Sequence, residues 1–178
     1  WNLFAKYANG PMNAFYAHLR VNNASEGAAA AAAGINPAVD DVTSNRLGFA
    51  YSFPMGLKVG VVWDKTKVEG NGTVAGGSGT NLQRTAWSLP ISYTMGAHGL
   101  YFAYAKAGNL SGTLAPVGVN SGAKNVILGY TYSLSKRTQL GVSYSKITNE
   151  SAATYGFWTR GTSVATPAGA DPTSFTVG

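Results

Sequence analysis

Apolar residues alternate with small or polar residues along most of this chain, and the alternation has a period of two. Side chains of a β-strand point alternately to its two faces, so this period predicts strands with one apolar face. In four segments the apolar parity reads Trp1, Leu3, Ala5, Tyr7; Leu47, Phe49, Tyr51, Phe53; Trp87, Leu89, Ile91, Tyr93; and Val126, Leu128, Tyr130, Tyr132, Leu134. The pattern therefore predicts an all-β chain.

Short turn signals separate these strands at regular intervals. From Pro11 to Pro54, then to Ala97 and to Lys136, the spacings are 43, 43 and 39 residues. Longer stretches rich in Gly, Ala and Asn lie between the turns, at 23–45, 68–82, 108–123 and 149–172. Short and long connections thus alternate strictly, as in outer-membrane barrels with short periplasmic turns and long external loops. We therefore expect a transmembrane antiparallel up-and-down β-barrel, of which this chain holds eight whole strands and the start of a ninth.

The strands that leave the short turns share a finer pattern. On the apolar parity of each, a ring residue is followed two positions later by a basic residue, as in His18 and Arg20. Rings and snorkelling cations occupy the membrane interface, so we expect an interfacial girdle; solvated strand ends are the alternative. The predicted girdle rings are Tyr7, Tyr51, Trp63, Trp87, Tyr93, Tyr104, Tyr132 and Tyr144. The predicted rim cations, which we expect to contact outer-membrane lipids and lipopolysaccharide phosphates, are Arg20, Lys65, Lys106 and Lys146.

Four basic residues lie on the opposite parity, which we expect to face the lumen: Lys6, Arg46, Lys58 and Arg84. A cation that faces lipid at the bilayer midplane costs roughly 2–4 kcal/mol, which favours the lumen for these residues. Basic side chains that line a narrow passage attract anions, so we expect small hydrophilic, preferentially anionic solutes. The alternative is a position at the barrel rim, above all for Lys58, which lies beside a turn.

One strand departs from the pattern, because Phe15, Leu19 and Val21 share the parity expected to face water. Either an infolded loop covers these apolar residues, or the strand is shifted by one residue. The shift would turn Arg20 inward.

Composition narrows the possible functions. Charged residues make up 11% of the 178 residues, against roughly 25% in soluble domains. The net charge of +6 is spread along the chain rather than gathered in runs, which argues against nucleic-acid binding. The chain has no Cys and only two His, neither of which lies in a recognisable pattern with an acid and a serine. We therefore expect no enzymatic activity, no catalytic residue, no metal site and no cofactor.

Three segments carry a resemblance to a known family: Tyr7–Pro11 with the strand after it, Leu128–Thr138, and Gly169–Gly178. They resemble the trimeric general diffusion porins of Gram-negative bacteria. The resemblance implies a 16-stranded barrel in the bacterial outer membrane, assembled as a homotrimer, that passes small hydrophilic solutes by passive diffusion. It also implies that residues 1–178 are the C-terminal portion of a single barrel domain, without the final aromatic residue. The loop that narrows the pore would then belong to the absent N-terminal half.

Two other readings of the sequence stay open. The first is a closed eight-stranded outer-membrane barrel that acts as an adhesin or structural anchor, with side chains filling its interior. The second is a secreted β-sandwich or binding module. The Gly, Ala and Ser residues on the predicted lumen face suit a large water-filled barrel better than a filled small one.

Overall fold

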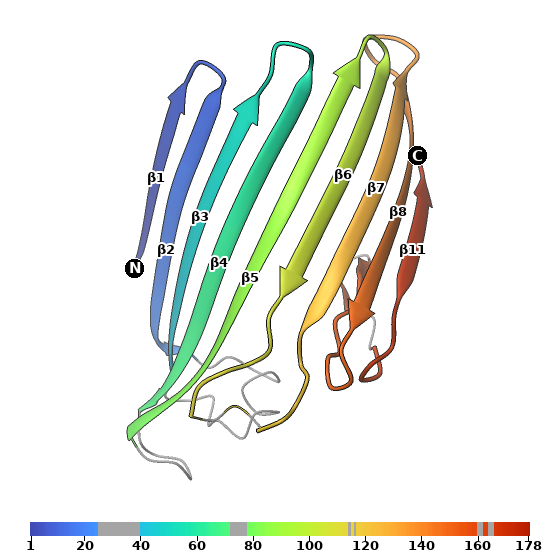
Figure 1. Ribbon diagram of the computed structural model, residues 1–178. Helices are drawn as coiled ribbons and strands as arrows, with labels where there is room; N and C mark the ends of the chain where they lie inside the picture. Colours follow the sequence, from blue (N-terminus) through green and yellow to red (C-terminus); the bar gives the residue numbers. More distant parts are fainter. Residues whose placement is uncertain (25–39, 72–77, 114, 116, 160–161, 164–165) are drawn as a thin grey trace.

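The computed structural model describes residues 1–24, 40–71, 78–113, 115, 117–159, 162–163 and 166–178. Nine strands form one sheet in the order β1-β2-β3-β4-β5-β6-β7-β8-β11, and all neighbours are antiparallel (Figure 1). The strands are β1 (Asn2–Asn9), β2 (Met12–Ala24), β3 (Asp40–Ser52), β4 (Leu57–Asn71), β5 (Ser78–Met95), β6 (His98–Ala107), β7 (Ala123–Ser133), β8 (Gln139–Asn149) and β11 (Thr173–Val177). The predicted all-β antiparallel fold is confirmed.

The connections also follow the prediction. Short turns join the strands at one end of the sheet, and the longer connections that follow β6 and β8 lie at the other end (Figure 1). Gly10, Gly56 and Gly96 provide the positive φ angles that three of the short turns require. Within the described residues, no helix is long and apolar enough to cross a membrane.

Three of the predicted connections need correction. The predicted connections 23–45 and 68–82 are partly strand, because β3 begins at Asp40, β4 ends at Asn71 and β5 begins at Ser78. The remainder of each, 25–39 and 72–77, lies outside the described residues. The predicted connection 149–172 contains a small separate hairpin of β9 (Trp158–Thr159) and β10 (Thr162–Ser163).

The strand register defines the two faces of the sheet. Trp63 pairs with Leu47 on one side and with Trp87 on the other, and Trp87 in turn pairs with Lys106. Paired residues of antiparallel strands point to the same face, so the predicted apolar stripes form one continuous surface. We call it the outer face. All eight predicted girdle rings and all four predicted rim cations have the parity of this face.

Large apolar side chains of the outer face are exposed. Leu3, Leu47, Leu100 and Leu128 are each about half exposed. Among the described residues, the buried apolar side chains are only Val42, Ala103, Ala123, Ile147 and Ala153. A soluble sandwich would bury its apolar stripe against a second sheet, whereas a membrane barrel leaves it for lipid.

The register also decides how β2 is oriented. Phe15 pairs with Lys6 and Gly48, and Arg20 pairs with Thr43 on the outer face. The one-residue shift is therefore wrong, and Phe15 does point to the inner face. A Cβ atom at position 48 would overlap the Phe15 ring, so Gly48 provides the space that the ring occupies. The Phe4 ring packs beside it, with 6.2 Å between ring centroids.

Candidate pore lining

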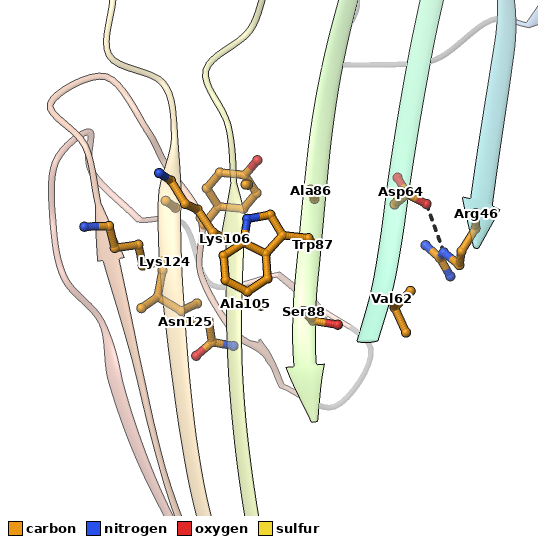
Figure 2. Close-up of a pocket in the computed structure, with 14 residues that line it drawn as sticks. Arg46, Val62, Asp64, Ala86, Trp87, Ser88, Ala105, Lys106, Lys124 and Asn125 are labelled. Atoms are coloured by element: carbon orange, nitrogen blue, oxygen red, sulfur yellow. Dashed lines mark hydrogen bonds and ion pairs between the residues drawn. The ribbon is translucent and has the colours of Figure 1, made fainter. Parts of the chain in front are cut away.

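The face opposite the outer face, which we call the inner face, is built mostly from small and polar side chains, with a few larger apolar residues among them. Its central rows contain Val62, Ser88, Ala105, Asn125 and Ile147, and beside them Arg46, Asp64, Ala86, Ala107 and Ala123. With Tyr155 these residues line a hollow of about 430 Å³ (Figure 2). Trp87, Lys106 and Lys124 belong to the same stretch of sheet, but the register directs their side chains to the outer face. The inner face therefore leaves open space.

All four predicted pore-lining cations lie on the inner face. Their heights can be compared by following the register across to β4. The side chains are then level with these positions of β4: Lys58 with 58, Lys6 with 62, Arg46 with 64 and Arg84 with 66. At about 3.4 Å per residue, this cation ladder is roughly 27 Å long. The four side chains come from β1, β3, β4 and β5, so they are spread across the sheet as well as along it.

Arg46 is held by a carboxylate on the neighbouring strand. Its Nε donates a hydrogen bond to Asp64 Oδ2 at 2.9 Å, as Figure 2 shows, and Thr66 Oγ1 donates to the other carboxylate oxygen at 3.3 Å. The Arg46 side chain is 57% exposed, so its charge still faces the hollow. Sequence reasoning missed Asp64, although its parity on β4 opposes that of Trp63 and places it on the inner face.

Arg84 has a different environment, because two loops fold back onto it. Its Nη2 donates a hydrogen bond to the Ser121 carbonyl oxygen at 3.0 Å, and its Nη1 donates to the Tyr155 hydroxyl. The guanidinium carbon also lies 5.1 Å from the centroid of the Tyr155 ring. Arg84 thus ties the 108–122 and 150–157 loops to the wall of the sheet. Sequence reasoning placed it on the inner face but gave no sign of these contacts.

The 150–157 loop is braced from its other side by Asn149. The Asn149 side chain accepts from Tyr155 N at 3.1 Å and donates to Tyr155 O at 2.9 Å and to Ala170 O at 2.6 Å. Burial raises the pKa of Tyr155 above its usual value of 10.0, and the nearby Arg84 charge opposes part of that rise. The phenol is therefore neutral at physiological pH, and in that form it accepts the hydrogen bond from Arg84.

Lys6 and Lys58 lie in a second hollow of about 450 Å³, nearer the short turns. Phe15, Gly48, Ala50 and Gly60 are among its other lining residues, and none of the lining residues is acidic. Both lysines are exposed, and within the described part of the chain neither forms an ion pair. Among the described residues, therefore, no carboxylate neutralises their charges.

The predicted rim cations divide into two kinds. Arg20 lies 3.3 Å from Asp41 Oδ2, and Lys146 lies 3.9 Å from Asp171 Oδ2. Lys65 and Lys106 have no carboxylate within 4.0 Å among the described residues. Sequence reasoning also missed Lys124, which is the direct cross-strand partner of Lys106. That pairing depends on the register across a long connection and has no local signal.

In the described part of the chain, no group of three or more His, Asp or Glu residues is placed to hold a metal ion.

Comparisons with known proteins agree with this architecture. A family model described as "Gram-negative porin" matches residues 1–152. The fold is similar to that of an anion-selective porin from Comamonas acidovorans, with a TM-score of 0.75 and 23% sequence identity. That match covers 98% of this chain and 46% of the other, so the chain spans about half the length of its structural relative. No curated protein sequence matches the chain significantly.

Proposed function

The chain belongs to the Gram-negative porin family of the bacterial outer membrane, and from this premise we propose that it forms part of the wall of a water-filled channel. Small hydrophilic solutes, anions preferentially, cross the channel by passive diffusion. Residues 1–178 are the C-terminal portion of a single barrel domain, and the whole protein assembles as a homotrimer, as the family resemblance implies.

One observation carries the anion preference. Among the described side chains of the paired strands, the charged residues on the inner face are the four cations of the ladder and Asp64. The local excess is therefore three positive charges. A passage lined by an excess of one charge concentrates counter-ions, here anions, and repels ions of the same sign. The structural relative is named an anion-selective porin, which supports the same reading.

The four cations play different roles in this proposal. Lys6 and Lys58 supply unpaired charge near the short turns. Arg46, fixed by Asp64, presents its guanidinium at the middle of the ladder. Arg84 holds the two infolded loops and adds charge at the end of the ladder that lies toward the long connections.

The alternative of a filled eight-stranded anchor has less support. A ninth strand, β11, continues the sheet beyond β8 and leaves β1 and β11 at its two edges. Hollows of about 430–540 Å³ lie along the inner face between small side chains. A closed eight-stranded barrel is just wide enough for its own side chains to fill.

We expect the full-length protein, reconstituted in a planar bilayer, to give discrete, ohmic conductance steps. The bilayer is bathed in about 1 M KCl, where screening leaves only a short Debye length. An open passage has this signature because ions move through water rather than through a conformational cycle. Protein that inserts into vesicles of the same lipid but gives no conductance in the bilayer would contradict the channel and favour the anchor.

A further inference from the structure

The outer face carries a feature that channel function does not require. Lys106 of β6 and Lys124 of β7 are direct cross-strand partners, and both are exposed. Like charges directly opposite each other on neighbouring strands destabilise a sheet. Trp87 of β5 is the partner of Lys106 on its other side, and Figure 2 shows its ring beside that lysine.

In the part of the chain that the structure describes, no carboxylate within 4.0 Å relieves this repulsion. Three other cations on the outer face have acidic neighbours within 4.0 Å: Arg20 with Asp41, Lys67 with Glu69, and Lys146 with Asp171. Neither Lys106 nor Lys124 has such a neighbour among the described residues. The pair is therefore an uncompensated dication at the end of the sheet that carries the long connections.

An apolar groove lies on the same strands, farther toward the short turns. It has a volume of about 430 Å³, and its lining includes Leu100, Phe102, Leu128, Val142 and Phe175. Along β6 the outer-face residues run Lys106, Tyr104, Phe102 and Leu100, so a cation is followed by a ring and then by the groove. Phe102 is four residues from Lys106, which corresponds to roughly 14 Å of extended strand.

We propose that this surface binds one phosphorylated lipid of the outer leaflet. The phosphate lies between the Lys106 and Lys124 ammonium groups, and an acyl chain follows the groove between Leu100, Leu128 and Val142. A phosphate supplies several acceptor oxygens and removes the lysine–lysine repulsion, and the adjoining apolar groove favours an amphiphile over a soluble anion. Trp87 and Tyr104, whose rings are 5.3 Å apart, lie at the level between head and chain.

This proposal rests on the proposed orientation of the outer face toward lipid. It narrows the expectation drawn from sequence, in which Arg20, Lys65, Lys106 and Lys146 contact lipid alike. Arg20 and Lys146 already have carboxylate neighbours, and Lys124 replaces them as the second phosphate ligand.

The test compares two double variants of the full-length protein that remove the same charge from the same rim. Lys106→Gln with Lys124→Gln removes the proposed site, whereas Arg20→Gln with Lys146→Gln removes two carboxylate-paired cations. The probe is bisphosphorylated lipid A, and its retention on the detergent-solubilised protein is measured by native mass spectrometry. We expect the first variant to bind roughly ten- to thirtyfold more weakly, because each cation at an anionic surface contributes roughly fivefold. The lipid A affinity of the control variant should fall by less than about twofold, because Arg20 and Lys146 already lie near carboxylates in the parent protein.

Two further arms identify the ligand. Dephosphorylated lipid A should bind the parent protein as weakly as lipid A binds the first variant. Inorganic phosphate alone should not displace bound lipid A. The proposal would be overturned if both double variants lost lipid A affinity equally. It would also be overturned if the parent protein retained dephosphorylated lipid A as well as lipid A, or if inorganic phosphate displaced bound lipid A. Bilayer conductance, which the first variant should retain, separates failure of the lipid site from failure of the channel.

Discussion

Replacing Lys6 and Lys58 by glutamate is expected to convert the proposed anion-preferring pore into a cation-preferring one. The two substitutions change the charge excess of the described inner-face side chains from +3 to −1, because these include four cations and Asp64. At about 0.1 M salt the Debye length is close to 10 Å, so charges that line the passage still act on passing ions. We expect the ratio of chloride to potassium permeability to fall roughly three- to tenfold in about 0.1 M KCl.

The matched control changes the same charge elsewhere. Lys136 and Arg137 lie in the exposed short connection between β7 and β8, and replacing both by glutamate also lowers the net charge by four. We expect this variant to keep the parent permeability ratio, and Lys6→Arg with Lys58→Arg to keep it as well. If the variant with glutamate at positions 6 and 58 keeps the chloride-to-potassium permeability ratio of the parent protein, the ladder does not determine selectivity.

The second large effect is expected from Arg84, which we propose fixes two infolded loops. Arg84→Lys keeps the charge but loses the contacts of the planar guanidinium with the Ser121 carbonyl and the Tyr155 ring. Charge-assisted hydrogen bonds contribute roughly 1.5–3 kcal/mol and cation–π contacts roughly 0.5–2 kcal/mol. The lysine ammonium replaces part of these interactions, so the loop equilibrium should shift roughly ten- to a hundredfold toward release. Conductance and open-channel noise should rise, while the anion preference stays.

Hydrogen exchange provides the structural readout for this variant. Backbone amides of 150–157 should exchange faster in Arg84→Lys, whereas those of central β7 should be unchanged. Tyr155→Phe, which retains the ring under the guanidinium but loses the hydroxyl, should give a smaller increase. Unchanged exchange together with unchanged noise would mean that Asn149 alone fixes the loop and that Arg84 does not.

The pKa of Tyr155 sets the pH range of this contact. Because burial raises that pKa above 10.0, the neutral phenol is favoured in the folded loop. The raised pKa contributes stability that is fully present below pH 10.0 and is lost as the pH rises through the raised value. Loop closure should therefore not depend on Tyr155 ionisation between about pH 6 and 9.

The alternation of side chains was enough to predict the two faces of the sheet. A period of two assigns each residue to a face without knowledge of its partners, and the register places Lys6, Arg46, Lys58 and Arg84 on one face. Strict alternation of short and long connections was likewise enough to predict the up-and-down topology, because turns and loops differ in length and composition.

The contacts of the ladder could not be predicted in the same way. Arg46 meets Asp64 only because β3 and β4 are aligned in one particular register, and a slip of one residue would separate them. Arg84 meets Tyr155 across 71 positions of sequence, through a loop that folds back onto the sheet. Phe15 faces inward because Gly48, on another strand, leaves room for its ring. Each of these depends on a long-range neighbour, which local pattern does not encode.

The reversal potential of the unmodified full-length protein is the most direct test of the account. It is measured in a planar bilayer with a tenfold gradient of roughly 0.1 against 1 M KCl, a range over which screening changes strongly. The potential reports the ratio of anion to cation permeability. A charge excess of three cations on the inner face predicts a potential displaced toward the chloride equilibrium potential, more so as the mean salt concentration falls. Displacement toward the potassium equilibrium potential would contradict the central claim that the cation ladder lines the pore.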